Sequence, residues 1–554
     1  MAELVLGPVQ RYADEQQATV WVETDASCEV RVLDHTARTF EVHGHHYALV
    51  ILDGLTPGTT TPYTVELDGR RVWPEPGAEF PPSCIRTRDH RRPVRLMFGS
   101  CRTSVPEQPE ERRKHGVDML AAFGKRLTQL PQEEWPDLVF MLGDQVYADE
   151  TPDVVRHGIE QRRDTDQGPG EELADFEEYT WLYHMAWSQP AIRWVLSTLP
   201  SIMIFDDHDV RDDWNTSQTW RDQIRELDWW QQRIVGGLTS YWVYQHLGNM
   251  SPEELSTDPL FARVRAAEGN AGPLMDEFSY GVDQDPESAR WSYVRDVGRV
   301  RMLAVDCRCA RVLTPGGRRM VDETEWAWLR EQASADVDHL VIGTSLPFMM
   351  PEGIHDLEGW NEAVCDGVWG RRAARVGEWI RQAVDLEHWA AFRTSFVDMA
   401  ELVREVATRE NPPATVLFLS GDVHYSYLAR ARVPGAGAGA SAVFQAVCSP
   451  IRNPLTRVLR YANVVGQFGI ARLIGHVLAR AARVPRSSLQ WSIDEGPWFD
   501  NVLATLELDG RSATVRWDAP GERGEEDGAL RRVADIPLTS AESAGAERAG
   551  ASAG

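Results

Sequence analysis

The sequence predicts an α/β protein with a small all-β domain over residues 1–92, followed by a larger domain of alternating strands and helices over 93–539. At 554 residues, 43% of them hydrophobic, the chain is long enough for two or more domains with cores of their own. Up to about residue 92, short β-branched or aromatic runs follow one another without helices. Beyond residue 93, apolar runs alternate with longer amphipathic stretches, which is typical of α/β domains.

Four runs in the first domain predict strands: ATVWVET, CEVRVL, HYALVIL and TPYTVEL. Turn signals such as DGLTPGT and DGR separate them, and several short strands without helices predict a β-sandwich. The run DGLTPGTTTPYTVELDG resembles the turn and following strand of a fibronectin type III or immunoglobulin-like domain. RTRDHRRP then predicts a basic linker.

Six apolar runs predict the strands of the second domain: VRLMFGS, DLVFMLGD, SIMIFDDHD, VRMLAVD, HLVIGTS and ATVLFLSGD. Three aromatic-rich stretches predict helices: EYTWLYHMAWSQPAIRWVLSTL, WRDQIRELDWWQQRIVGGLTSYWVYQHL and ETEWAWLREQAS. We expect their aromatic side chains in the core. Residues 156–178 are polar and acidic and predict a loop insertion, whereas 434–441 predict a flexible loop and 540–554 a disordered tail.

Composition narrows the class of protein. The net charge of −27 argues against non-specific nucleic-acid binding and suits a protein that carries multivalent cations. Seven cysteines without CxxC spacing predict neither a disulfide framework nor a zinc finger. The first residues show no signal peptide and no run of eighteen apolar residues occurs, so we expect a cytoplasmic protein, or an exported one in its mature form. P-loop, serine-esterase and kinase motifs are absent from the sequence.

Acidic residues follow the apolar runs where those runs end. Asp144, Asp206 or Asp207, Asp306 and Asp422 would converge at one edge of a sheet. Several carboxylates at one edge repel one another unless a cation lies between them. The sequence therefore predicts a metal site at this edge.

Two motifs add other ligand types. In GDQVYAD, Asp144 and Tyr147 are three residues apart and reach one site if the chain leaves its strand in a tight loop. In GDVHYSY, Asp422 and His424 are two apart and lie on the same side of an extended chain. Taken alone, a Gly-Asp pair after a strand is equally typical of a turn with a helix cap, and Cys101 after PVRLMF is compatible with a core residue or a thiolate ligand. FDDHDVRDDWN, with five acids and a histidine in eight residues, favours metal binding.

The ordered motifs FGSCR, GDQVYAD, FDDHDVRDDWN, AVDCRCAR and GDVHYSY resemble those of the PhoD-like alkaline phosphatase family of metallophosphatases. The resemblance covers most of the chain and implies a four-layer αββα core whose site holds Fe(III) and Ca²⁺, with other divalent metals as alternatives. Carried over position by position, it implies Cys101 and Tyr147 as thiolate and phenolate ligands of Fe(III) with His424 beside them, Asp144 as the bridging ligand and Asp422 as a calcium ligand.

The segment after the third predicted strand departs from the family pattern. The family commonly has an Asn after its Asp-Asp-His-Glu, and here Asp212 takes that position with Asp213 beside it, both candidate metal ligands. An extra carboxylate there changes which divalent metal is preferred. Asp207, a further candidate ligand, and His208 stand where more distant metallophosphatases place an Asn-His pair. His208 is therefore a candidate catalytic acid or a group that orients a ligand, with a structural hydrogen bond to a carboxylate as the alternative.

A second departure lies in AVDCRCAR. Asp306, Arg308 and Arg311 match the family's Asp-Thr-Arg stretch, with Cys307 in place of Thr. We expect an arginine here, Arg308 first, to hold phosphate oxygens in a bidentate contact.

The function that these residues predict is a metal-dependent phosphoesterase that cleaves phosphate mono- or diesters by attack of a metal-activated hydroxide. Asp144, His208 and Arg308 are the candidate catalytic residues. Two alternatives remain: a nucleotide or phospholipid phosphodiesterase that uses the same site, and a non-catalytic, metal-containing binding protein.

Residues 423–493 contain no Asp or Glu in an otherwise acidic chain. Within them, 455–484 predict one or two amphipathic helices. Their apolar and basic positions recur at helical spacing: Val458, Leu459, Phe468, Leu473, Val477 and Leu478, with Arg460, Arg472 and Arg480. Three interpretations compete: a helix packed in the core, a cationic lid over the site, and a surface helix that contacts an anionic membrane.

Overall fold

The computed structural model of the chain describes residues 1–89, 92–106, 108–437, 439–455, 460, 470–521 and 528–539. The predicted tail 540–554 lies outside the described residues, and so do three of the apolar positions named above, Val458, Leu459 and Phe468.

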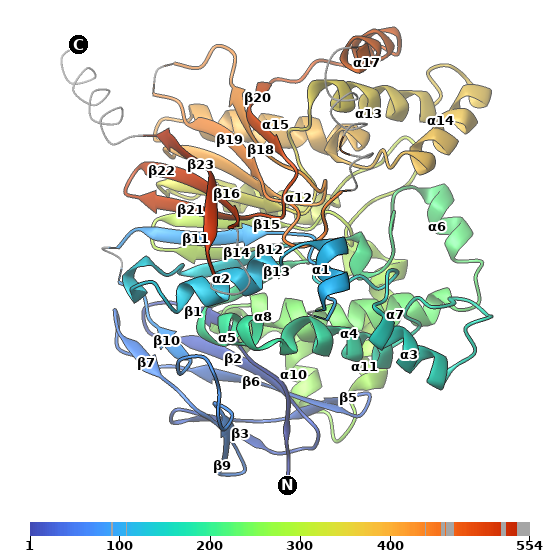
Figure 1. Cartoon of the computed structure of the whole chain (residues 1–554). Coiled ribbons are helices and arrows are strands. Elements are labelled where there is room, and N and C mark those ends of the chain that lie inside the picture. Colours follow the sequence, from blue (N-terminus) through green and yellow to red (C-terminus); the bar gives the residue numbers. More distant parts are fainter. Residues whose placement is uncertain are drawn as a thin grey trace, which may run out of the picture.

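Two mixed sheets form the centre of the second domain (Figure 1). The first has the strand order β13-β12-β11-β21-β22-β23 and the second has the order β14-β15-β16-β17-β19-β18-β20. The strands of the first sheet are β11 (Val94–Gly99), β12 (Leu138–Leu142), β13 (Ser201–Ile204), β21 (Leu503–Asp509), β22 (Ser512–Pro520) and β23 (Leu530–Thr539). Those of the second are β14 (Tyr293–Val297), β15 (Val300–Val305), β16 (His339–Thr344), β17 (Thr415–Ser420), β18 (Ser426–Arg432), β19 (Ala442–Val447) and β20 (Gln490–Trp498).

All six predicted core strands are confirmed as β11, β12, β13, β15, β16 and β17. Within each sheet these strands pair in parallel, so their carboxyl ends lie at one edge. The four strands β20 to β23 near the end of the chain were not predicted, and their antiparallel hairpins complete both sheets.

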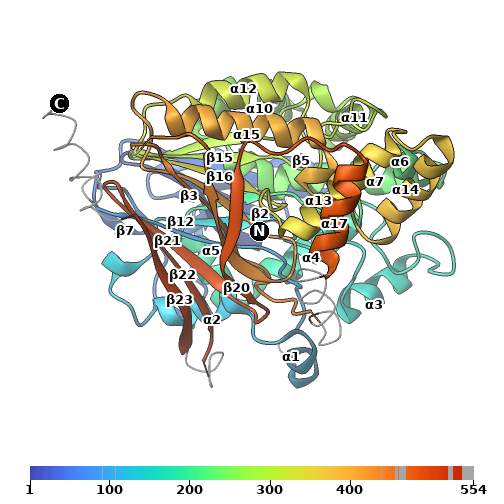
Figure 2. The ribbon, with the colours of Figure 1, turned by 90° about the horizontal axis from the view of Figure 1, so that it is seen from above.

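Helices cover the outer faces of the two sheets, which confirms the four-layer αββα arrangement (Figure 2). The helices before β14 are α1 (Pro109–His115), α2 (Met119–Leu127), α3 (Asp153–Arg162), α4 (Phe176–Ser188), α5 (Pro190–Thr198), α6 (Gln218–Ile224), α7 (Trp230–Ser240), α8 (Leu247–Asn249), α9 (Pro252–Thr257), α10 (Pro259–Ala266) and α11 (Gly272–Gln284). Those after β15 are α12 (Glu323–Ala333), α13 (Glu352–Cys365), α14 (Arg371–Ala383), α15 (Arg393–Thr408) and α17 (Ile470–Ala481). Short helical turns occur at η1 (Gln132–Glu134), η2 (Asp207–Asp209), η3 (Tyr241–His246), η4 (Pro286–Ser288) and η5 (Trp389–Ala391).

The apolar core between the sheets contains Phe98, Phe140, Leu417 and Phe444. These side chains are removed from water on both sides, which explains why the strands read as continuous apolar runs rather than alternating ones. Within the described part of the chain, no helix is both long enough and apolar enough to cross a membrane.

Three predictions about helices are wrong. The stretch 220–247 is not one helix, because α6 ends at Ile224 and α7 begins only at Trp230. Residues 156–178 are not one loop, because α3 runs to Arg162 and α4 begins at Phe176 with Asp175 as its N-cap. The polar surface of α3 hides a short buried stripe of Val155 and Ile159. The stretch 178–199 is two helices, because Pro190 has no N–H with which to continue α4 and instead begins α5.

The interpretation of 455–484 as a helix packed in the core is wrong for α17. Leu473 and Val477 are more than half exposed, at 66% and 56%. Arg472 contacts Glu352 of α13, and the Nε of Arg460 donates to the carbonyl of Leu455 over 2.8 Å. The lid interpretation stays a prediction.

The first domain is all-β, as predicted. One sheet has the order β1-β2-β6-β5, a second has the order β4-β3-β8-β9, and β7 pairs with β10. Its strands are β1 (Leu4–Ala13), β2 (Ala18–Thr24), β3 (Glu29–Val32), β4 (His35–Arg38), β5 (Phe40–Val42), β6 (His45–Leu52), β7 (Thr60–Pro62), β8 (Val65–Leu67), β9 (Arg70–Trp73) and β10 (Cys84–Arg86). The run TPYTVEL, predicted as one strand, is divided between β7 and β8 in different sheets. The fibronectin or immunoglobulin likeness stays a prediction.

The two domains share one buried aromatic cluster. Trp21 of the first domain lies 5.4 Å from the ring of Tyr244 and 6.2 Å from that of Trp187, between ring centroids. Beside them Arg11, fully buried, donates to the carbonyls of Ser201, Tyr244 and Gln245 and to Oδ1 of Asn249, over 2.6–3.1 Å. Ser201 begins β13, so the first domain supports a strand that leads into the acidic edge.

We expect Arg11→Met to lower the free energy of unfolding by about 3 kcal/mol, because it removes four buried hydrogen bonds between the two domains. Denaturant unfolding of the whole chain measures the loss. Arg31→Met is the matched control, since Arg31 lies on β3 of the same domain with a side chain 51% exposed. Equal losses in the two variants would contradict this account of the domain contact.

Candidate metal centre

Four candidate ligands lie at the same position relative to four different strands. Cys101, Asp144, Asp206 and Asp422 each come two residues after the last residue of β11, β12, β13 and β17. Because these strands are parallel within their sheets, the four side chains gather where the carboxyl ends of both sheets meet. The pattern of apolar runs followed by polar residues, which predicted the site, therefore also explains its position at this edge of the sheets.

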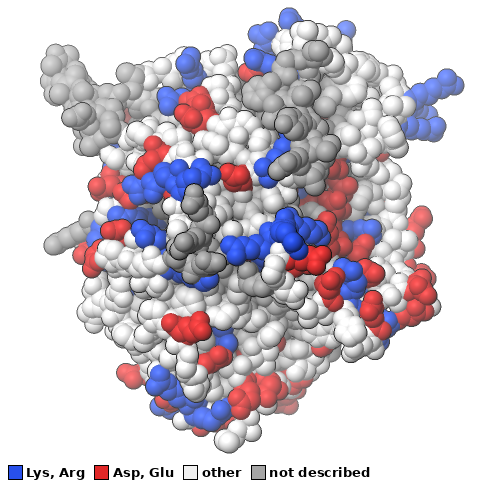
Figure 3. All heavy atoms as spheres, in the orientation of Figure 1, with Lys and Arg blue, Asp and Glu red and all other residues white. Residues whose placement is uncertain are grey.

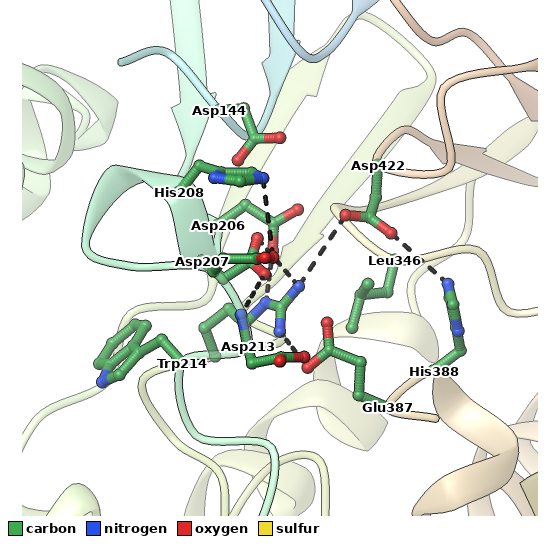
Figure 4. Close-up of polar contacts among 12 residues, drawn as sticks. Asp144, Asp206, Asp207, His208, Asp213, Trp214, Leu346, Glu387, His388 and Asp422 are labelled. Carbon is green, nitrogen blue, oxygen red and sulfur yellow. Dashed lines mark hydrogen bonds and ion pairs between the residues drawn. The ribbon is translucent and has the colours of Figure 1, made fainter. Parts of the chain in front are cut away.

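The candidate ligands form two groups that share one residue. Ligand atoms of Cys101, Asp144 and His424 lie within 4.8 Å of one another, and so do those of Asp144, Asp206, Asp207 and Asp422. Figure 4 shows Asp144, Asp206, Asp207 and Asp422 turned toward a common space. Asp144 belongs to both groups, which is the arrangement that a bridging ligand needs.

The backbone at these residues is strained. Cys101, Asp144, Asp422 and His424 have φ values of 58°, 50°, 65° and 55°, in the left-handed region that non-glycine residues seldom adopt. Such conformations persist where the surrounding structure imposes them, and they gather at functional sites. The prediction that Asp422 and His424 share one side of an extended chain is therefore wrong, because tight turns bring them to the site.

The first group combines sulfur, nitrogen and oxygen donors. Sγ of Cys101 lies 3.3 Å from Oδ2 of Asp144, and Oη of Tyr147 lies 3.4 Å from the same oxygen. The ring of His424 is held by a hydrogen bond from Nδ1 to the carbonyl of Asn453 over 2.8 Å, which leaves Nε2 for a metal. Burial and the charge of Asp144 raise the pKa of the Cys101 thiol well above its ordinary value.

The second group holds negative charge that the chain does not fully compensate. Burial raises the pKa of Asp144 well above its usual range, and the charge of Asp206 raises it further. Oδ1 of Asp144, Oδ2 of Asp206 and Oδ1 of Asp213 are buried without a hydrogen-bond partner. Oxygen-rich donor sets suit Ca²⁺, and a set with thiolate and phenolate suits iron. The residues present thus fit a cation.

Arg308 supplies the positive charge at the floor of the second group. It is fully buried, with Nε 2.5 Å from Oδ1 of Asp206, Nη2 3.2 Å from Oδ1 of Asp207 and Nη1 2.5 Å from Oε2 of Glu387. Arg311, also buried, contacts the same Glu387 oxygen at 3.2 Å. Nε and Nη1 of Arg308 are engaged by Asp206 and Glu387, whereas Nη2 makes no hydrogen bond. A bidentate contact of Arg308 with phosphate stays a prediction.

The structure separates the two aspartates at the position of the family's Asn. The side chain of Asp212 is 65% exposed and lies 3.8 Å from Nε2 of His208. Asp213 turns inward, with its N–H donating to Asp207 over 3.1 Å. Burial and the charge of Glu387 raise the pKa of Asp213 to about 9. Of the two candidate ligands, Asp213 is the one at the carboxylate cluster.

Asp306 does not join the carboxylate cluster, which corrects the expectation that it converges with the other strand-terminal acids. Its oxygens accept hydrogen bonds from the N–H groups of Arg308, Cys309 and Ala310 and so cap the turn after β15. That turn fixes the backbone from which Arg308 reaches the cluster.

Sequence reasoning missed several residues that orient the site. Nδ1 of His208 lies 3.0 Å from Asp149, the structural alternative considered for this histidine. His388 lies between Glu358, at 2.6 Å, and Asp422, at 3.5 Å. Burial alone would lower the pKa of His388. The charge of Glu358 and the contact with Asp422 outweigh this effect and raise the pKa well above its ordinary value. The run DLEHW over 385–389 carried a signal, with two acids and a histidine in four residues, but it follows no strand.

Comparisons with known proteins identify the family and the fold. The family model of PhoD-like phosphatases matches residues 121–457, and that of a domain of unknown function, DUF7800, matches residues 1–85. A solved structure described as "Structure of PhoD" has a TM-score of 0.59 at 11% identity and covers 97% of this chain and 92% of its own. At that identity the likeness concerns the fold alone. No curated protein matches the chain.

Without metal, we expect Asp144→Asn to raise the melting temperature at pH 8 by about 1–3 °C, because it removes a carboxylate that its buried neighbours repel. The pKa of Asp144 is raised in the folded state, so its contribution to stability is complete below about pH 4 and is lost as the pH rises toward the folded value. The gain from the substitution should therefore be larger at pH 8 than at pH 5, in melts with a chelator.

Asp118→Asn is the matched control for this melt. Asp118 is also fully buried. Burial alone would raise its pKa, but Arg102 and Arg452 outweigh this effect and hold the pKa below the ordinary value. This variant should melt lower than the unsubstituted chain. A lower melting temperature of Asp144→Asn in the absence of metal would contradict the account that the buried carboxylates of the cluster repel one another.

Proposed function

The chain belongs to the PhoD-like phosphatase family, and from that premise we propose that it is a metal-dependent hydrolase of phosphate mono- or diesters. The observation that supports this most is the position of Asp144, shared by two groups of buried candidate ligands. A non-catalytic binding protein would not need two such groups joined at one carboxylate beside a histidine held by an acid.

Two sets of residues would hold the metals. Cys101, Tyr147, His424 and Asp144 would hold Fe(III), and Asp144, Asp206, Asp207 and Asp422 would hold Ca²⁺. When bound, such cations offset the charge of a phosphate ester and make water more acidic at neutral pH.

His208 is the candidate proton donor to the leaving group. Its Nδ1 is held by Asp149, and its ring lies against that of Tyr147 with centroids 4.6 Å apart, so its orientation is fixed. Burial alone would lower the pKa of His208. The charges of Asp149 and Asp207 outweigh this effect and raise the pKa well above its ordinary value. This shift favours the protonated ring, the form that a general acid needs.

Positively charged groups on the other side of the cluster position the carboxylates. Arg308 forms ion pairs with Asp206 and Asp207. His388 lies beside Asp422 (Figure 4), at 3.5 Å. Burial alone would raise the pKa of Asp422, but the contact with His388 outweighs this effect and holds the pKa below its ordinary value. This carboxylate therefore stays ionised and available as a ligand.

We expect Asp144→Asn to lower kcat/KM for p-nitrophenyl phosphate by about 100-fold or more, because both groups lose their shared ligand. The assay uses protein purified with its metals, and circular dichroism checks that the fold is kept. Glu150→Gln, which changes an exposed carboxyl close by in the sequence, should stay within about threefold of the unsubstituted enzyme. Normal turnover by Asp144→Asn would remove this residue from the site.

The metal assignment predicts a coloured protein. A phenolate on Fe(III) gives a visible charge-transfer band, so Tyr147→Phe should remove that band while elemental analysis still finds iron, held by the remaining ligands. Tyr179→Phe, a change at a buried tyrosine of α4, is the control and should leave the spectrum unchanged. Colourless, fully active protein with stoichiometric zinc and no iron would contradict the assignment.

A further inference from the structure

Helix α17 packs against α13 with its small residues rather than its large apolar ones. Gly475 lies so close to Gly353 of α13 that an added Cβ would come within 2.7 Å of the Gly353 carbonyl oxygen, and Ala479 is buried. Leu473, Ile474 and Val477 are instead 66%, 51% and 56% exposed. A helix of a globular protein normally turns its apolar face toward the core. Here the apolar face looks outward.

Helix α14, on the other flank of α13, has the same inversion. It buries Gly377 and Arg381, and the guanidinium of Arg381 contacts Glu378 at 3.1 Å and Glu362 at 3.6 Å. Trp379 is 70% exposed. The exposed large apolar residues around it are Val368, Trp369, Val376 and Val384.

These residues lie on or next to two helices that both pack against α13, and together they are named the α14–α17 surface: Val368, Trp369, Val376, Trp379, Val384, Leu473, Ile474 and Val477. Eight of the twelve exposed large hydrophobic side chains in the described part of the chain belong to it. Figures 1 and 2 show both helices beside α13 at the same end of the molecule. Apolar side chains gathered in this way mark a binding surface rather than the scattered exposure found on every protein.

Arginines surround this surface in a chain of net charge −27. Arg371, Arg372 and Arg375 lie on α14 and Arg480 on α17, all exposed, and none forms an ion pair within the described residues. Two acids beside α17 are engaged: Glu352 contacts Arg472, and Asp356 lies 3.4 Å from His476. Figure 3 shows basic side chains along the upper edge of the molecule, where these helices lie.

A groove of about 840 Å³ beside α17 continues the basic surface. Six arginines line it, together with the acids Glu352 and Asp356: Arg393, Arg430, Arg432, Arg472, Arg480 and Arg486. Of these, Arg430 is paired with Asp494 at 2.9 Å and Arg472 with Glu352, whereas no ion pair within the described residues engages the other four. The groove thus adds a place for phosphate groups directly next to the exposed apolar residues.

We propose that the α14–α17 surface docks on an anionic lipid membrane, with its tryptophan and aliphatic side chains at the acyl boundary and its arginines at the headgroup phosphates. Amphipathic helices that lie in the membrane plane combine these residue types. Tryptophan favours the interface because one end of its ring is apolar and the other polar, and arginine stems cover apolar surface while the charge reaches the phosphates.

The charge pattern favours lipid over a second copy of the chain. A two-fold interface brings the same patch of both copies together, and here it would place arginines against arginines. An anionic bilayer instead meets every one of these charges with an opposite one. The proposal is independent of the phosphoesterase reaction.

The test is sedimentation of the full chain with vesicles of phosphatidylcholine alone and of phosphatidylcholine mixed with phosphatidylglycerol. We expect binding to the mixed vesicles that weakens at high salt, and Trp379→Ser with Ile474→Ser should weaken it by about tenfold or more. Val154→Ser with Leu227→Ser is the matched control, since these side chains are 60% and 41% exposed on other elements, and it should bind as the unsubstituted chain does.

Two outcomes would overturn the proposal. One is absence of binding to the mixed vesicles, or binding that the Trp379 and Ile474 substitutions leave unchanged. The other is a dimer in sedimentation velocity that the same substitutions dissociate, without vesicle binding, which would assign the surface to a second copy. Melting curves of both double variants show whether a loss of binding reflects a loss of fold.

Discussion

Repulsion among buried carboxylates is the constraint around which the second domain is organised. Asp144, Asp206 and Asp207 lie in a space that water scarcely reaches, where like charges cannot all remain ionised without a counter-charge. Arg308 provides part of that charge, and it is held in turn by Glu387, which Arg311 also contacts. Arg308 leaves part of the negative charge uncompensated, and a cation would compensate the rest. The position for that cation lies where the carboxyl ends of both sheets meet.

The rest of the architecture holds this edge in place. The four turns that leave β11, β12, β13 and β17 each place a candidate ligand two residues after the strand. At three of them, Cys101, Asp144 and Asp422, that residue has the left-handed backbone that persists only where the surrounding structure imposes it. The first domain contributes through Arg11, which ties the start of β13 and the turn η3 together on the outer side of the sheet. Contacts far from the metal centre thus help to fix the positions of the residues that form it.

The sequence was informative where chemistry follows local pattern. Apolar runs ending in Gly-Asp or Asp-Asp predicted the strands, and through them Asp144 and Asp422, because strand direction alone decides where such residues emerge. Asp306 follows a strand in the same way, yet its carboxylate caps the next turn, a choice that depends on the backbone of Arg308 to Ala310. His388 comes from a loop between helices, and only the tertiary fold brings it to Asp422. Helical spacing likewise defined an apolar face on α17 without saying what that face would meet.

The account rests on the claim that the metal-free cluster keeps protons that a cation must displace. Burial raises the pKa values of the Cys101 thiol and of the Asp144 and Asp206 carboxyls well above their ordinary range, so metal binding at pH 7 should release about one or more protons per ion. Calorimetric titration of the metal-stripped protein with iron and calcium, in buffers of different ionisation enthalpy, counts those protons. The account predicts a clear release that decreases in Asp144→Asn. Tight metal binding without proton release would contradict it.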